Sequence, residues 1–360
     1  MQETSAHPPT CLPCAASPGL VAVDQPTDLY VMDSDGRPLT CQAGQRRRSS
    51  TRRSEKPGRT PPSPHTVLRP EADGQLQYLV EWWSAQPDIV ARFGNAIDSA
   101  IQYVLDGART GRFDLQDRRV DPDERRSVGT KLQFHVLEEF KLPRKKSPDT
   151  AVGEVAFDIK GTVRGNWSIP VEAQCEICLL VQINIKKRTH RAWLMRTHRK
   201  WLHNGDGNGD QKRGINKEAH GKYAIPLYSE APLPMAPLTL LNDEQLALVF
   251  GPEGQKKRLT HLFSMLKNVV IGRATILTVC AGRDDPLRRA REARSIMKDN
   301  GYALLCGAWT PQRQMAGLLG HDLSGNAWVS VPWEDILNHG PLTAEVLNSM
   351  ERKDPDSIEP

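Results

Sequence analysis

Residues 148–160 read Pro-Asp-Thr-Ala-Val-Gly-Glu-Val-Ala-Phe-Asp-Ile-Lys, and this stretch decides the fold prediction for the first half of the chain. Gly153 favours a turn, which separates a short extended piece at 148–150 from a predicted strand at 155–160. The sequence therefore predicts two adjoining extended segments.

The predicted strand places two charged side chains on one face. Alternate residues of a strand share a face, so Asp158 and Lys160 should project together while Phe157 and Ile159 pack into the core. Asp149 lies at the end of the preceding extended piece, across the turn. We therefore expect its carboxylate within a few ångströms of that of Asp158.

Two carboxylates and an amine in one place indicate metal-dependent chemistry. Mg²⁺ takes oxygen ligands, keeps several waters and bridges to substrate phosphate, and Lys160 could orient a water or stabilise charge on phosphorus. Pro-Asp followed at a distance by Asp-x-Lys is typical of the PD-(D/E)xK nucleases. The alternative is a structural salt bridge, because Asp-x-Lys is common at strand edges.

The flanking sequence predicts a compact domain. Apolar residues recur every fourth position over 89–105, and Asp88 is placed as the N-cap. A second helix is predicted at 127–140, and buried strands are predicted at 176–185 and 191–196. This mixture indicates an α/β (α+β) nuclease core with a central mixed sheet.

The second half of the chain predicts a different architecture. Helices are predicted at 242–249, 256–270, 272–281 and 286–298, and strands at 302–306 and 327–331. Two helices across a tight turn, followed by a hairpin-like element, are typical of a winged helix-turn-helix. The expected organisation is a disordered leader (1–72), an endonuclease domain (73–222), a linker (223–238), a winged-helix domain (239–340) and a tail (341–360).

Positive charge is unevenly distributed along the chain. The formal net charge is +5, but basic residues concentrate at 46–59, 186–222 and 256–298. A polyanion partner selects such segregation, because each neutralised phosphate releases condensed counterions. Six arginines on or near the candidate recognition helix are expected to contact DNA: Arg273, Arg283, Arg288, Arg289, Arg291 and Arg294. The alternative is a solvated face that forms ion pairs with Glu292.

The seven cysteines do not predict a zinc or disulfide framework. Cys11/Cys14 and Cys175/Cys178 have metal-type spacing, but about 160 residues separate the two pairs. Cys175 and Cys178 are expected to behave as small buried hydrophobic residues. No catalytic role is assigned to the histidines of the basic loops, which are His190, His198, His203 and His220.

Neither a membrane span nor a secretory signal is recognisable. No stretch approaches the roughly 18 consecutive apolar residues that a spanning helix needs, and the first residues lack a basic-then-apolar pattern. We therefore expect a cytoplasmic protein.

Several segments together resemble the NaeI family of restriction endonucleases. The segments are 91–94, 106–112, Val128-Gly129-Thr130-Lys131-Leu132-Gln133, the Asp149/Asp158/Lys160 set, 166–170 with 178–181, 271–274 and 285–289. The resemblance covers roughly 75–332. It implies a nuclease domain related to the mismatch-repair nicking enzyme MutH, a C-terminal winged-helix domain, and a type IIE homodimer that a second double-stranded DNA site activates.

One position departs from the family pattern. The family carries a glutamate four residues after the Gly129 position, and here that residue is Gln133. At 100° per residue, neither Glu138 nor Glu139 shares the helix face of Gln133. An amide oxygen can ligate Mg²⁺ but brings no charge, so we expect weaker metal binding. The resemblance implies a catalytic set of Asp149, Asp158, Lys160 and Gln133, with Asp149 and Asp158 as Mg²⁺ ligands.

The sequence thus favours a site-specific, Mg²⁺-dependent double-strand DNA endonuclease. The alternatives are a winged-helix DNA-binding protein with an inactivated nuclease domain, and a MutH-like nickase. A restriction enzyme without a protecting partner would destroy its host's chromosome, so a cognate DNA methyltransferase is the expected genetic partner.

Overall fold

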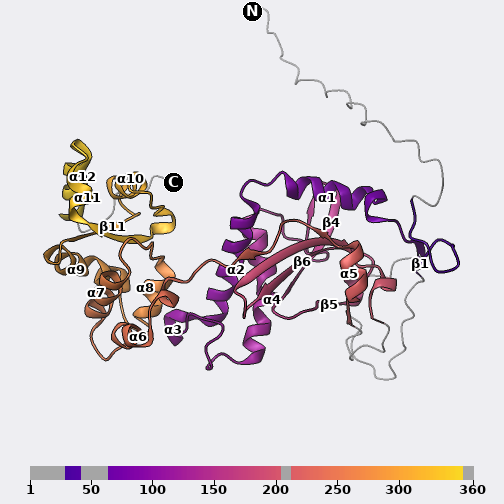
Figure 1. Ribbon diagram of the computed structural model, residues 1–360, viewed down its shortest axis with the longest axis horizontal. Helices are drawn as coiled ribbons and strands as arrows, with labels where there is room; N and C mark the ends of the chain where they lie inside the picture. Colours follow the sequence, from indigo (N-terminus) through magenta and orange to yellow (C-terminus); the bar gives the residue numbers. More distant parts are fainter. Residues whose placement is uncertain (1–28, 42–63, 204–211, 352–360) are drawn as a thin grey trace, which may run out of the picture.

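The computed structural model describes residues 29–41, 64–203 and 212–351. They form an N-terminal lobe built on a β-sheet and a mostly helical C-terminal lobe (Figure 1). The basic stretch 46–59 and the pair Cys11/Cys14 lie outside the described residues. Within the described ranges, no helix is both long and apolar enough to cross a membrane.

The N-terminal lobe contains the predicted mixed sheet. Its strands are β3 (Thr150–Val152), β4 (Val155–Thr162), β6 (Ile177–Asn184), β7 (Thr189–Arg196), β9 (Ile225–Pro226) and β10 (Ala231–Pro232). The order is β10-β7-β6-β4-β3, and β9 also pairs with β7. Only the β4–β6 pair is parallel among these pairings, and its register places Asp158 beside Cys178. The α+β fold with a central mixed sheet is therefore confirmed.

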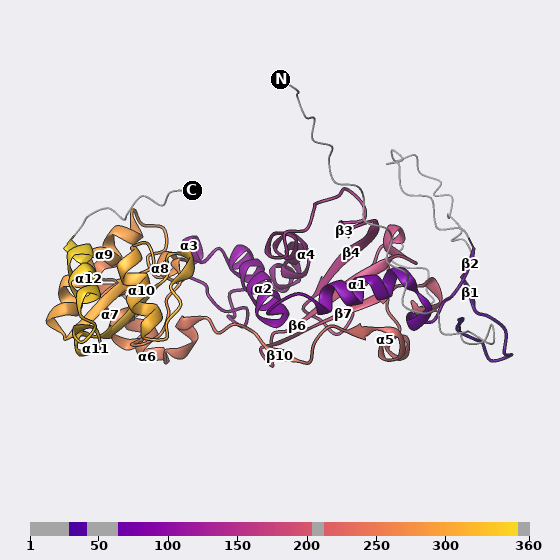
Figure 2. The same ribbon diagram turned by 90° about the horizontal axis from the view of Figure 1, so that it is seen from above.

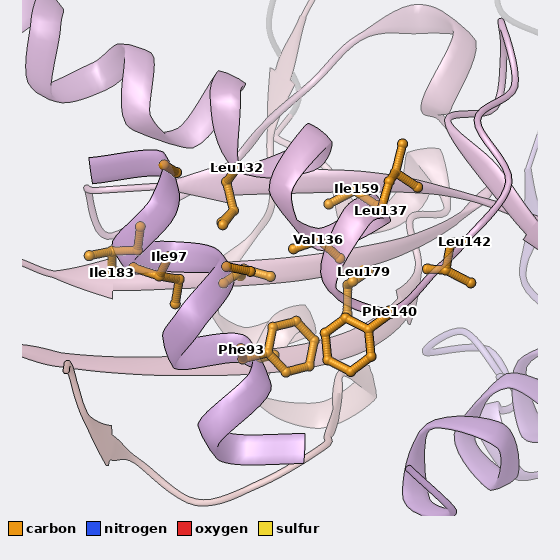
Figure 3. Packing of buried hydrophobic residues seen from close by; sticks show 14 of the residues in the cluster. Phe93, Ile97, Leu132, Val136, Leu137, Phe140, Leu142, Ile159, Leu179 and Ile183 are labelled. Carbon is orange, nitrogen blue, oxygen red and sulfur yellow. The ribbon is translucent and has the colours of Figure 1, made fainter. Parts of the chain in front are cut away.

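A helical layer covers one face of this sheet. It comprises α1 (Gly74–Ser84), α2 (Ile89–Leu105) and α4 (Pro122–Glu139). Figure 3 shows Phe93 and Ile97 of α2 and Val136 of α4 packed over Leu179 and Ile183 of β6. The apolar spacing of the two helices thus produces the main core of the lobe.

Helix α4 begins five residues earlier than the sequence analysis predicts. The Asp121 side chain accepts a hydrogen bond at the helix start, the backbone N–H of Asp121 donates one to the Glu124 carboxylate, and Pro122 occupies the first turn. This capping box is a recognisable start signal, and it precedes the apolar positions on which the prediction depended.

The opposite face of the sheet is covered by an irregular layer. Trp167, Trp201 and Ile215 contribute buried side chains here, beside α5 (Lys217–Tyr223) and the pair β5 (Ser168–Ile169) and β8 (Arg213–Gly214). Strand β6 is buried on both faces, which explains why its sequence is a continuous apolar run.

The expectation of a disordered leader is wrong for residues 29–41 and 64–72. Strands β1 (Thr40–Cys41) and β2 (His65–Thr66) pair antiparallel, and Val31, Cys41 and Val67 are buried in the layer just described. A Pro- and Arg-rich composition lowers local structural propensity, but these few apolar side chains gain burial against the sheet.

The expectation of a free linker at 223–238 is also wrong. Strands β9 and β10 of this segment pair with β7, and Leu227 and Leu233 pack against the main core. Edge strands of two residues carry too little periodicity to be recognised in a sequence.

The C-terminal lobe contains the predicted helices and strands together with further helices. The elements are α6 (Asp243–Val249), α7 (Gln255–Met265), α8 (Arg273–Val279), α9 (Pro286–Asp299), β11 (Tyr302–Cys306), α10 (Thr310–Leu318), β12 (Trp328–Pro332), α11 (Trp333–Leu337) and α12 (Pro341–Glu351). Strands β11 and β12 pair antiparallel, with α10 between them in the chain. The connection is therefore longer than the hairpin-like element that was predicted.

The predicted tail at 341–360 is wrong for residues 341–351, which form α12. Val346 is fully buried, and Gln312 of α10 donates a hydrogen bond to Ser349 at 2.9 Å. Leu342, Val346 and Met350 recur at helical spacing, so an apolar face was present in the sequence.

The two lobes contact each other through short helices. Figure 2 shows α3 (Gly107–Thr110) of the N-terminal lobe beside α8 of the C-terminal lobe. The backbone N–H of Gly282 donates to the carbonyl of Ala108 at 2.7 Å, and the rings of Phe113 and Phe250 stack at 6.0 Å.

Candidate active site

Asp149 and Asp158 hold each other through the backbone. They occupy opposite positions at the continuation of the β3–β4 register, in which Thr150 pairs with Phe157. The N–H of Asp149 donates to Oδ1 of Asp158 at 3.0 Å, and the N–H of Ile159 donates to Oδ2 of Asp149 at 2.9 Å. Each carboxylate is therefore fixed by one amide, which leaves its remaining lone pairs available.

Lys160 completes the cluster. Its Nζ lies 3.7 Å from Oδ2 of Asp149 and 3.8 Å from Oδ2 of Asp158. Strand alternation brings Asp158 and Lys160 to the same face, as predicted, while Phe157 and Ile159 are buried in the core beneath the helices. The structure therefore brings together three of the four residues expected to be catalytic.

Burial governs the protonation of this cluster. Burial raises the pKa of the Asp158 carboxyl, and the negative charge of Asp149 adds to the effect, while Lys160 opposes it. Burial by itself would lower the pKa of Lys160, but the combined negative charges around it, that of Asp158 foremost, outweigh burial and the pKa is raised. Lys160 is therefore an ammonium ion at neutral pH, and its single positive charge faces two carboxyl groups.

Helix α4 approaches strand β4 through two glycines. A Cβ added at Gly129 would lie 2.5 Å from the backbone oxygen of Gly161, and one added at Gly161 would lie 2.5 Å from the backbone oxygen of Gly129. Only glycine permits this distance at both positions. Because Gly161 follows Lys160 directly, this contact sets how closely the part of β4 that carries Lys160 packs against the helix.

Gln133, the fourth expected residue, lies half-buried one helical turn after Gly129. Among the described residues, no hydrogen bond joins its amide to Asp149, Asp158 or Lys160. Glu139 does not replace it, because its carboxylate lies 3.5 Å from Arg92. Gln133 thus lies on the helix that packs against β4, without a hydrogen bond to the cluster among the described residues.

Two neighbours of the cluster were missed in the sequence. Cys178 pairs in register with Asp158, and burial raises its pKa to about 12, which keeps the thiol neutral. Glu172, in the short helix η3 (Val171–Ala173), contributes negative charge that raises the pKa of both Asp158 and Lys160. The loop before β6 offered no periodic signal that would have indicated its proximity.

Five of the six predicted DNA-contacting arginines have accessible side chains. Arg273, Arg283 and Arg288 are exposed, and Arg289 and Arg291 are partly exposed. Arg288 and Arg289 both form ion pairs with Glu292, at 3.1 and 2.7 Å.

Arg294 has a different environment. Its guanidinium lies 4.5 Å from the ring of Trp309 and 5.3 Å from that of Trp328, and it donates to Gln312 at 3.0 Å. Burial lowers its pKa to about 10. The guanidinium therefore packs against buried aromatic residues of the C-terminal lobe, and these contacts compete with a contact to DNA.

The comparison with known proteins covers most of both lobes. The family model of restriction endonuclease NaeI matches residues 84–331. No curated protein matches the chain. The matched range contains the Asp149/Asp158/Lys160 cluster, Gln133 and all six arginines, and it spans well over half of the 360 residues. The chain therefore belongs to the NaeI restriction endonuclease family.

Proposed function

We propose that this chain is a site-specific double-strand DNA endonuclease that hydrolyses phosphodiesters with the help of a divalent cation, Mg²⁺. The observation that carries the proposal is the convergence of Asp149, Asp158 and Lys160 within 4 Å on one edge of the sheet. Family membership supports DNA as the substrate.

The residues fit a hard divalent cation. Two carboxylates offer oxygen atoms at a buried position, where burial, together with the charge of Asp149, raises the pKa of Asp158 and a bound cation would favour its charged form. Asp149 and Asp158 are the candidate ligands. When bound, Mg²⁺ would polarise the scissile phosphate and lower the pKa of a coordinated water.

The residues of the chain then have distinct tasks. The Lys160 ammonium can donate hydrogen bonds to the attacking water or to the phosphate oxygen that gains charge as water adds to phosphorus and the bond to the leaving oxygen breaks. The amides of Asp149 and Ile159 hold the two carboxylates in place, so little reorganisation accompanies the reaction.

We further propose that the C-terminal lobe is a winged-helix DNA-binding domain. Helix α9 begins after a tight turn, with Asp285 as N-cap and Pro286 in the first turn, and it presents Arg288, Arg289 and Arg291. Exposed arginines at the start of a helix suit contacts to phosphates and guanine edges. A homodimer that engages two DNA sites belongs to the same proposal, and sedimentation with and without DNA would test it.

The direct test is incubation of the full chain with plasmid DNA and Mg²⁺. Discrete linear fragments are expected. Asp158→Asn and Lys160→Met should each lower cleavage by roughly 100-fold or more, whereas Glu138→Gln, at an exposed position of α4, should not. Intact plasmid across divalent metals and varied DNA sequences would refute the proposal.

A second candidate function is favoured by Gln133. If the missing carboxylate abolishes catalysis, the chain is a DNA-binding protein that binds tightly and in a salt-dependent manner without cleavage. A Gln133→Glu variant that gains cleavage, beside an inactive natural chain, would identify this case. Nicked rather than linear plasmid would indicate a nickase.

A further inference from the structure

A second cluster of metal-ligating side chains lies outside the candidate active site. Cys41 ends β1, His65 begins β2, Cys175 precedes β6 and His198 follows β7. One ligand atom from each of the four residues lies within 4.8 Å of all the others. Cys41, Cys175 and His198 are almost fully buried, with 1%, 6% and 2% of their surface exposed.

Two distances within this Cys₂His₂ cluster are close to those of a tetrahedral zinc site. Nε2 of His65 lies 3.1 Å from Nδ1 of His198, and Sγ of Cys41 lies 3.8 Å from the same nitrogen. Zinc bonds of about 2.0–2.1 Å to nitrogen and about 2.3 Å to sulfur place tetrahedral neighbours roughly 3.3 to 3.8 Å apart. The side chains thus already surround a space of the correct size.

The backbone around the cluster is arranged to present these side chains. Cys175 has a φ of 67°, a left-handed conformation that is unfavourable for a non-glycine residue. Its N–H donates to the carbonyl of Thr197 at 2.8 Å, which ties it to the residue before His198. The ring of Trp201 packs edge-on against His198 at 4.6 Å and limits its rotation.

We propose that Cys41, His65, Cys175 and His198 bind a structural Zn²⁺ ion. Four protein ligands leave no open position, which is typical of structural rather than catalytic zinc. The ion would join three separate segments: the β1–β2 segment, the loop before β6, and the end of β7. This proposal does not depend on the proposed nuclease activity.

The proposed zinc site is connected through the chain to the neighbours of the Asp149/Asp158/Lys160 cluster. The segment from Glu172 to Cys178 connects the proposed zinc site to the neighbours of Asp158. Loss of zinc should therefore loosen both the N-terminal segment and the loop that carries Glu172. The sequence expectation that Cys175 is only a small buried hydrophobic residue is incomplete, because its partners come from distant segments.

Metal analysis of the full chain, purified under reducing conditions, tests the proposal. About one zinc ion per chain is expected, retained on dialysis against a weak chelator. Cys175→Ser and His65→Asn should each lower the zinc content strongly. Cys280→Ser, at a buried free cysteine of the C-terminal lobe, is the matched control and should keep it.

Cobalt substitution gives a readout that does not require DNA cleavage. Co²⁺ at this site should show intense tetrahedral ligand-field bands and a thiolate charge-transfer band, whereas Co²⁺ held by carboxylates lacks the thiolate band. If Cys175→Ser fails to fold, the cobalt spectrum of the His65→Asn variant tests the proposal in its place. A folded, reduced chain without zinc and without the thiolate band after cobalt addition would overturn the proposal, as would a Cys41–Cys175 disulfide in that preparation.

Discussion

The contact between Gly129 and Gly161 offers a sharp test of how the helical layer positions strand β4. In a Gly129→Ala variant, the added Cβ would lie 2.5 Å from the oxygen and 2.8 Å from the carbonyl carbon of Gly161. Both are backbone atoms, so no side-chain rotation can relieve the clash. Restoring an ordinary 3.4 Å contact requires α4 and β4 to separate by roughly 0.9 Å.

Two opposing contributions decide the expected change in stability. Overpacking of a core costs about 1–3 kcal/mol, and a clash with backbone on both sides belongs at the upper end. Alanine within a helix is favoured over glycine by about 1 kcal/mol. We therefore expect the free energy of unfolding to fall by about 2 kcal/mol. Gly221→Ala in α5, where no atom lies within 4 Å of the new Cβ, should show only the gain in stability from the higher helix propensity of alanine.

Urea denaturation followed by circular dichroism measures this difference in stability. Cleavage should also fall, by roughly 100-fold, at temperatures at which the variant is folded, because a displacement near 1 Å moves Lys160 relative to the carboxylates. A Gly129→Ala variant as stable as the Gly221→Ala control, with unchanged cleavage, would show that the helix does not position the strand in this way.

Three further predictions concern other parts of the molecule. Arg294→Ala should lower the free energy of unfolding by about 2 kcal/mol, since its desolvated cation–π contacts contribute about that much. The same variant should leave the salt dependence of DNA binding unchanged, whereas Arg288→Ala should reduce the slope of log affinity against log salt concentration by about one. Mg²⁺ affinity, measured by calorimetric titration, should rise as pH increases through the raised pKa of Asp158, because the ion binds the deprotonated carboxylate; Asp158→Asn should lose this pH dependence. Gly107→Ala places a Cβ 2.3 Å from Oγ1 of Thr278, so it should destabilise the chain by about 1–3 kcal/mol, and a Thr278→Ala background should recover part of the loss in thermal unfolding.

The sequence was sufficient where structure depends on local periodicity. The alternation in 155–160 predicts both the strand and the shared face of Asp158 and Lys160, because the side-chain period of a strand is fixed. The spacing of apolar residues over 89–105 likewise predicts α2. In both cases one short window of sequence contains the whole signal.

The sequence was insufficient where structure depends on partners far apart in the chain. Cys41 and Cys175 are separated by more than one hundred residues, so the spacing rules for compact zinc sites do not detect them. Strands β1, β2, β9 and β10 are two residues long, and their pairing is decided by burial against a sheet that must already exist. The side chain of Arg294 differs from its neighbours on α9 only because Trp309 and Trp328 enclose it.

The distances around Lys160 favour the metal-binding interpretation of the Asp-x-Lys pattern over a structural salt bridge. A salt bridge that stabilises a buried site needs direct hydrogen bonds, normally 2.7–2.9 Å between nitrogen and oxygen, to offset desolvation. Lys160 instead lies 3.7 and 3.8 Å from the two carboxylates, which are themselves held by backbone amides. The charges are thus kept close but not in contact, in an arrangement with room for a further ligand. If the cluster were only structural, a folded chain with both Lys160→Met and Asp158→Asn would still cut DNA.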